Sequence, residues 1–88
     1  MGSRNVKGVQ YRRILAHLAA ARQAAGITQI ELAALVGSNQ SHVSKLERGE
    51  RILDVLQFAE LCRALKLDPR AVLQPILDRP ARRKRKPA

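Results

Sequence analysis

The 88-residue sequence has few of the residues that disulfides, metal sites and aromatic cores require. It contains no tryptophan, one tyrosine, one phenylalanine and a single cysteine, Cys62. One cysteine excludes an internal disulfide, and no cluster of cysteine and histidine offers a structural zinc site. A fold that depends on packing alone fits a reducing compartment, so we expect a cytoplasmic protein. A chain of this length supports one small domain, which excludes a multi-domain enzyme.

Long apolar runs and catalytic motifs are also missing from the sequence. No segment approaches the roughly 20 apolar residues that span a bilayer, and the polar residues 1–10 do not resemble a secretory signal. We find no nucleophile beside a base, no phosphate-binding glycine loop and no cofactor motif. We therefore expect no enzymatic activity, no cofactor and no bound metal.

Acidic residues are scarce, with 7 Asp and Glu against 17 Lys and Arg, a net charge of +10. Such a charge favours a polyanionic partner, most often nucleic acid. Residues 79–88 hold six basic residues and no acidic one, whereas residues 8–78 are nearly balanced. A basic segment flanked by prolines cannot bury enough apolar surface to fold. We expect a flexible N-terminus over residues 1–8 and a disordered basic tail over 79–88. The excess of arginine over lysine hints at a bacterial source.

Helix start and stop signals recur along the chain. Apolar residues at spacings of three and four predict a first helix over residues 11–25, ended by Gly26. Four further starts are marked by N-terminal capping residues: Thr28 with Glu31, Ser38 or Asn39, Asp54 with Gln57, and Asp68 before Pro69. Pro75 is expected to break or kink the fifth helix, leaving residues 76–77 in a separate turn. The sequence thus predicts an all-α, compact five-helix domain over residues 9–78.

Residues 28–49 contain two short helices joined by a Gly-Ser-Asn turn, the helix-turn-helix arrangement. This stretch closely resembles the Cro/C1-repressor (XRE-type) DNA-binding family. The resemblance is carried by Thr28-Gln29, Leu32-Ala33, Gly37, Val43-Ser44 and Glu47-Arg48-Gly49, and it extends from about Arg12 to Leu73. It implies a five-helix domain of the lambda-repressor-like type that binds operator DNA, usually as a symmetric dimer.

The third predicted helix places polar side chains on one arc, opposite Val43 and Leu46. Such side chains suit a major groove, where Gln pairs with adenine and Lys reaches guanine O6 and N7. With the resemblance, the predicted base-reading residues are Gln40, Ser41, Ser44 and Lys45. The predicted phosphate-binding residues are Gln29, His42, Arg48 and Arg51, with Arg12 and Arg13 as weaker candidates. For His42, an exposed polar side chain without a DNA contact is the equal alternative.

The resemblance also implies an internal ion pair between Arg22 and Glu47, the alternative being that each is solvated. Relatives often carry a polar residue at the position of Ile30, so this chain departs from the pattern there with an unexplained apolar side chain. Helices four and five carry more apolar residues than one small core requires. The dimer candidates among them are Val55, Leu56, Val72, Ile76 and Leu77.

These features together predict a sequence-specific, double-stranded DNA-binding transcriptional regulator that acts as a repressor and a homodimer on a palindromic operator. The alternative is an antitoxin that binds a toxin protein as well as its own operator. Toxin-wrapping segments need apolar anchors, and residues 79–88 offer only Pro and Ala. RNA binding is disfavoured because the stacking aromatics are missing.

Deleting residues 79–88 should weaken binding to all DNA sequences by a similar factor, because phosphate contacts carry no sequence information. The slope of log K against log salt concentration should flatten by about 0.9 for each phosphate that the tail neutralises in the full chain. Fluorescence anisotropy titrations of the full and truncated chains over a range of salt concentrations measure both effects. An unchanged slope would show that the tail does not lie on DNA.

Overall fold

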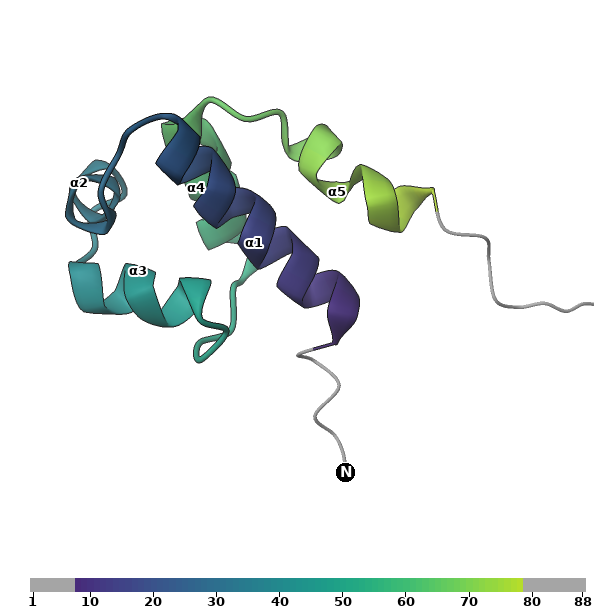
Figure 1. Cartoon of the computed structure of the whole chain (residues 1–88), viewed down its shortest axis with the longest axis horizontal. Helices are drawn as coiled ribbons and strands as arrows, with labels where there is room; N and C mark the ends of the chain where they lie inside the picture. The colour runs from purple at the N-terminus through teal and green to yellow at the C-terminus, as the bar shows by residue number, and fades with distance from the viewer. Residues whose placement is uncertain (1–7, 79–88) are drawn as a thin grey trace, which may run out of the picture.

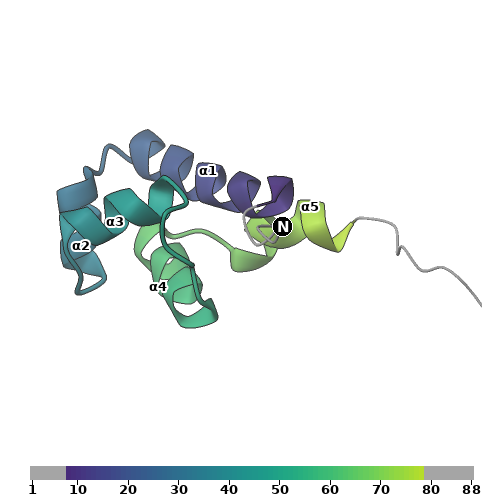
Figure 2. The same cartoon turned by 90° about the horizontal axis from the view of Figure 1, so that it is seen from below.

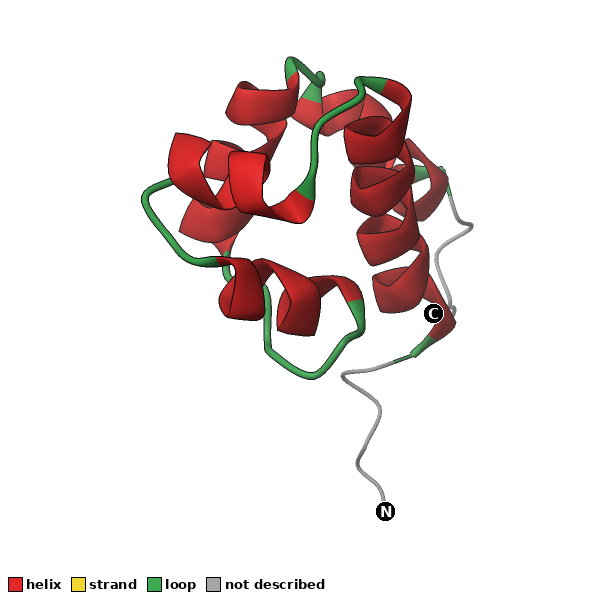
Figure 3. Ribbon diagram, turned by 60° about the vertical axis from the view of Figure 1, so that its left-hand side comes forward, coloured by secondary structure: helices red, strands yellow, loops and turns green. Residues whose placement is uncertain are grey.

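The computed structural model describes residues 8–78 and confirms the all-α, five-helix prediction. The helices are α1 (Val9–Ala24), α2 (Gln29–Leu35), α3 (Gln40–Glu47), α4 (Val55–Leu65) and α5 (Pro69–Leu77) (Figure 1). Short loops join them, and no strand occurs among the described residues (Figure 3). The predicted disordered tail at 79–88 and all but the last residue of the predicted flexible N-terminus lie outside this range.

Side-chain caps start the helices where the sequence predicts them. The Thr28 side chain accepts a hydrogen bond from the backbone N–H of Glu31, and the Glu31 carboxylate accepts from the Thr28 N–H, which completes a capping box. Asp54 and Gln57 form the equivalent box on α4. Asn39, and not Ser38, caps α3 by accepting from the His42 N–H.

The turn between α2 and α3 depends on a glycine. Gly37 has a φ of +69°, a left-handed conformation that costs glycine little and other residues more. It lets the Ser38 N–H donate to the Ala33 carbonyl oxygen at 2.8 Å, which closes the end of α2. This turn sets the direction in which α3 leaves α2.

The core is built from small and aliphatic side chains, as the shortage of aromatics predicts. It is formed by Leu18, Leu32, Ala33, Val43, Leu46, Leu61, Cys62, Leu65 and Val72. α1 packs against α3, α4 and α5, while α2 packs against α3 and α4 (Figures 1 and 2). Ala33 is only 2% exposed in this core, so a larger side chain there would overpack it.

The expected break at Pro75 is wrong, because α5 runs through the proline to Leu77. Pro75 is two residues from the helix end, so it removes a single helical hydrogen bond, to the carbonyl of the exposed Ala71. Beyond it, the Asp78 N–H donates to the Gln74 carbonyl oxygen at 2.9 Å. Water can satisfy the Ala71 carbonyl, and the helix continues.

The structure also corrects one predicted dimer residue. Val72 is 3% exposed and belongs to the core, because it faces inward at the start of α5. It cannot contribute to an exposed apolar surface. Among residues 8–78, no helix is long and apolar enough to cross a membrane.

Tyr11 connects α1 to the loop between α3 and α4, a role for which the sequence holds no signal. Its hydroxyl donates to the Arg51 carbonyl oxygen at 3.0 Å and accepts from the Leu53 N–H at 2.9 Å. The single tyrosine of the chain thereby satisfies two backbone groups 40 and 42 residues away. It holds the segment that follows α3 against the body of the domain.

Replacing Tyr11 with phenylalanine should lower the free energy of unfolding by about 1–2 kcal/mol, because the partly buried Leu53 N–H loses its acceptor. Urea denaturation measures this decrease, and amide hydrogen exchange should show faster exchange at Leu53. Exchange at Leu61, in the middle of α4, is the internal control for global opening. Unchanged exchange at Leu53 would contradict this role.

Candidate DNA-binding surface

α3, the second helix of the helix-turn-helix, has one face in the core and one face exposed. Val43 and Leu46 are 2% and 4% exposed and anchor α3 to the core. Gln40 and Ser41 are exposed, whereas Ser44 and Lys45 are half-buried. α3 runs along the edge of the molecule below α2 (Figure 1). The structure therefore keeps the predicted base-reading residues out of the core, with the first turn of α3 the most exposed.

The predicted ion pair between Arg22 and Glu47 is present and largely buried. Arg22 Nε donates to Glu47 Oε2 at 2.7 Å, and Arg22 Nη2 donates to Glu47 Oε1 at 3.2 Å. A third bond from Arg22 Nη1 to the Ile27 carbonyl oxygen, at 2.7 Å, ties the same guanidinium to the loop before α2. The pair thus joins α1, the start of the helix-turn-helix and the end of α3.

Gln29 links this ion pair to the first residue of α3. Its Nε2 donates to Glu47 Oε1 at 2.9 Å, and its Oε1 accepts from Gln40 Nε2 at 2.7 Å. We call the chain of Arg22, Glu47, Gln29 and Gln40 the amide relay. All four residues are predicted site residues, but the sequence does not connect the two glutamines, which lie 11 residues apart.

His42 turns toward α4. Its Nε2 lies 3.0 Å from Gln57 Nε2, and the imidazole is half-buried. Since Gln57 Oε1 already accepts from the Asp54 N–H, the Gln57 side chain presents its NH2 group to the ring. The Gln57 NH2 group is therefore the donor of this hydrogen bond and His42 Nε2 is the acceptor. The side chain is less exposed than the alternative expected, and both the phosphate contact and the absence of a DNA contact stay predictions.

Two arginines follow α3 at the surface. Arg48 donates from Nε to Glu50 Oε2 at 2.9 Å and from Nη1 to Ser44 Oγ. The hydrogen bond with Glu50, and then its charge, raise the pKa of Arg48. Arg51 is exposed, and its carbonyl oxygen is the one held by Tyr11. Arg48 is thus paired with the acidic Glu50, and the Ser44 hydroxyl accepts a hydrogen bond from Arg48 on the side of α3.

A wide groove of about 540 Å³ lies between α3 and the start of α4. It is lined by His42, Lys45, Glu50, Arg51, Ile52, Asp54 and Gln57. Three predicted site residues meet here, His42, Lys45 and Arg51, beside the acidic Glu50 and Asp54 and the polar Gln57. The groove brings predicted base-reading and phosphate-binding residues together on one side of the domain.

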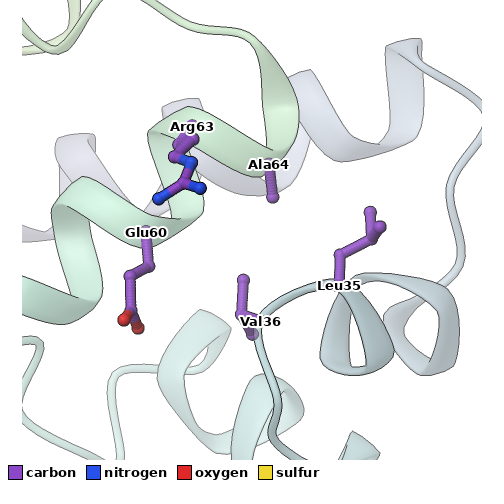
Figure 4. A pocket seen from close by; sticks show the side chains of 5 residues that line it. All are labelled: Leu35, Val36, Glu60, Arg63 and Ala64. Carbon is purple, nitrogen blue, oxygen red and sulfur yellow. The ribbon is translucent and has the colours of Figure 1, made fainter.

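A second groove, of about 290 Å³, lies between the end of α2 and α4. Leu35, Val36 and Ala64 supply its apolar wall, and Glu60 and Arg63 carry opposite charges (Figure 4). Leu35 is 60% exposed there. Ile30, where the chain departs from the family pattern, is also exposed, and nothing in the structure explains this apolar side chain.

Residues 8–78 contain no group of three or more His, Cys, Asp or Glu side chains that could hold a metal ion. Cys62 is 1% exposed in the core. Burial, with the nearby charge of Asp68, raises the pKa of the Cys62 thiol, so the side chain stays protonated at neutral pH. It acts as a small apolar core residue, as its place on the apolar face of α4 predicts.

Comparisons with known proteins agree with this geometry. Residues 18–72 match a helix-turn-helix family model. An XRE-family-like protein from Pseudomonas syringae is 46% identical, with a TM-score of 0.75 over 83% of this chain and 89% of that one. The clp gene regulator ClgR from C. glutamicum is 29% identical, with a TM-score of 0.69 over 75% and 86%. The restriction-modification controller protein C.AhdI from Aeromonas hydrophila is 32% identical, with a TM-score of 0.65 over 70% and 94%. The comparison with curated proteins found no match.

Replacing Glu47 with glutamine should lower the free energy of unfolding by about 3 kcal/mol, because the buried Arg22 guanidinium loses its counter-ion. Glu50→Gln is the matched control, since it removes the same charge from an ion pair whose side chains are about half exposed. Urea denaturation should show a lower midpoint for the first variant and a nearly unchanged one for the second. Equal midpoints would show that the buried pair has no special role in stability.

Proposed function

The chain belongs to the Cro/C1-type (XRE) family of helix-turn-helix DNA-binding regulators, and on this premise we propose that it is a sequence-specific repressor of transcription. In this proposal, residues 9–78 form the DNA-binding domain and α3 enters the major groove of an operator. The basic residues 79–88 lie along phosphates of the same DNA.

The observation that supports this proposal best is the division of α3 into two faces. Val43 and Leu46 are fixed in the core, while Gln40 and Ser41 project from the exposed first turn. A major groove about 12 Å wide admits one helix, and residues at its leading end reach base edges. Gln40, Ser41, Ser44 and Lys45 are the proposed base-reading residues.

The proposed phosphate contacts flank this helix. Arg48 and Arg51 follow α3, and His42 lines the groove toward α4 together with Arg51. Both polar atoms of the Gln29 side chain already bond to protein, so its phosphate contact would use the backbone N–H or the second amide hydrogen. These contacts would position α3 without reading sequence.

A homodimer would use apolar side chains that the domain leaves outside its core. Val55 and Leu56 at the start of α4 are 84% and 67% exposed, and Leu77 at the end of α5 is 57% exposed. Ile76 is half-buried beside Leu77. A two-fold dimer would place two α3 helices about 34 Å apart, which corresponds to half-sites centred roughly 10 base pairs apart.

Selection of bound sequences from random DNA duplexes tests the proposal as a whole. We expect one preferred site made of two inverted half-sites at that spacing, which identifies sequence reading and two-fold symmetry together. Repression is then measured with the selected site placed over a reporter promoter. The absence of any preferred sequence would overturn the proposal.

Lys45→Ala should weaken binding to the selected site by about 1–3 kcal/mol and relax the preference at one base pair per half-site. The matched control is Arg70→Ala, which removes one positive charge from an exposed residue of α5, remote in sequence from the helix-turn-helix. Anisotropy titrations with the selected site and with a scrambled duplex distinguish the two kinds of contact. Equal weakening on both duplexes would identify Lys45 as a phosphate contact.

A further inference from the structure

We propose that the exposed face of α4 is a self-complementary interface, on which a second copy of the chain lies with its α4 antiparallel to the first. Glu60 of each copy then pairs with the partner's Arg63, so the contact contains two identical ion pairs. The inference rests on the proposed function and deepens its homodimer, because it assigns the contact to one helix face and gives that contact a direction.

α4 exposes a row of side chains along its length. Residues three, four and seven positions apart lie on the same side of a helix, so five residues form one face. We call this the α4 face; it consists of Leu56, Ala59, Glu60, Arg63 and Ala64, of which only Ala64 is half-buried. The opposite side of the helix is buried in the core through Leu61, Cys62 and Leu65. The α4 face is therefore the side of this helix that the domain leaves available.

Two opposite charges lie at the centre of the α4 face. Within residues 8–78, no ion pair or side-chain hydrogen bond joins Glu60 or Arg63 to another residue. Both side chains line the groove between α4 and the end of α2 (Figure 4). A partner that carries the opposite charge can therefore approach either of them.

The order of residues along the α4 face is the same in both directions, except that the two charges differ in sign. Ala59 precedes Glu60, and Ala64 follows Arg63. An antiparallel copy, with the two-fold axis halfway between the charges, places each glutamate level with the partner's Arg63 and each Ala59 level with the partner's Ala64. Every contact in such an interface occurs twice, so one attractive pair becomes two. A parallel copy would bring glutamate level with glutamate, which is repulsive.

The side chains around the charges suit close packing of two helices. Ala59 and Ala64 are small, which allows the helix axes to approach to about 8 Å. Leu56, one of the dimer residues proposed above, is 67% exposed and precedes Glu60 by four residues. The half-buried Leu67 follows Arg63 by four residues, so Leu56 lies level with the partner's Leu67. Apolar contacts would therefore flank the two ion pairs.

The groove beside the α4 face gives the partner helix a second wall. Leu35 and Val36 line the groove on the side of α2, and Ala64 lines it on the side of α4 (Figure 4). Leu35 is 60% exposed in the single chain. A helix seated on the α4 face would cover part of this leucine and remove apolar surface from water.

The length of α4 sets the strength expected of this contact. α4 has 11 residues and is about 16 Å long, so a pair of such helices buries less than the roughly 1,200 Å² of a standard stable interface. We therefore expect a dissociation constant on the order of 10 μM in free solution. Two half-sites on one DNA molecule raise the local concentration of the second copy and favour the dimer there.

The test reverses one charge of the α4 face at a time and then combines the variants. Glu60→Arg leaves only positive charges on the face, and Arg63→Glu leaves only negative ones. Both residues are exposed, so both variants are expected to fold, which circular dichroism verifies. Arg13→Glu, which reverses an exposed charge of α1 outside the face, is the control matched to Arg63→Glu. Sedimentation equilibrium of the full chain without DNA, at one salt concentration, measures the dissociation constants.

Each single variant should dimerise at least about tenfold more weakly than the unaltered chain, because like charges then meet twice. The two variants change the net charge in opposite directions, so general repulsion between basic chains cannot weaken both. An equimolar mixture of Glu60→Arg and Arg63→Glu should recover dimer formation as a heterodimer, and the chain with both substitutions should recover it as a homodimer. Arg13→Glu should dimerise like the unaltered chain.

Three results would overturn the α4 interface while leaving sequence reading by α3 intact. One is a chain that is still monomeric at about 1 mM, where a dimer with the expected dissociation constant would be nearly complete. Another is undiminished dimerisation of both single variants, and the third is a mixture that dimerises no better than its components. A chain that selects no DNA sequence would instead overturn the proposed function, whereas the interface is measured without DNA.

Discussion

The buried ion pair between Arg22 and Glu47 is the constraint on which the DNA-binding surface depends. It joins the last turn of α1 to the last turn of α3, and the guanidinium also holds the loop before α2. The surrounding core is aliphatic, and aliphatic contacts are non-directional. Packing therefore decides that α3 lies against the core, whereas the ion pair and its hydrogen bonds restrict how α3 is rotated and placed.

Such a pair is a poor source of net stability, because removing two charges from water costs about as much as their attraction returns. Its value here lies in geometry. Glu47 is an acceptor for both Arg22 and Gln29, so one carboxylate connects the scaffold to the exposed turn of α3. An apolar pair of similar volume could fill the same space, but it could not impose a donor or acceptor role on Gln29.

The sequence predicts those features of this domain that are decided locally. The capping boxes at Thr28 and Asp54 depend on residues three positions apart, and the outward arc of α3 depends on helical periodicity. The unbroken helix at Pro75 could not be predicted, because the sequence does not show that Ala71, whose carbonyl loses its helical partner, is an exposed residue. The bonds of Tyr11 to Arg51 and Leu53, and of Gln29 to Gln40, join residues 11 to 42 positions apart. Periodicity and composition carry no signal for such contacts. Of the connections between the site residues, the Arg22–Glu47 ion pair is predicted, and that prediction comes from the family resemblance.

Within the proposed function, the charge distribution assigns non-specific affinity for DNA and discrimination between DNA sequences to different parts of the chain. Residues 8–78 carry nine basic and seven acidic residues, Arg22 is buried against Glu47, and Arg48 shares its charge with Glu50. The net charge of residues 8–78 is therefore only +2, which makes them a weak source of the counterion displacement from phosphates that supplies most non-specific affinity. The six basic residues of 79–88, a segment that contains no acidic residue, suit that role. When residues 79–88 supply the non-specific affinity in this way, the folded domain itself needs to make only weak contacts to DNA. A hydrogen-bond pattern as small as that of one glutamine can then decide which sites the protein occupies.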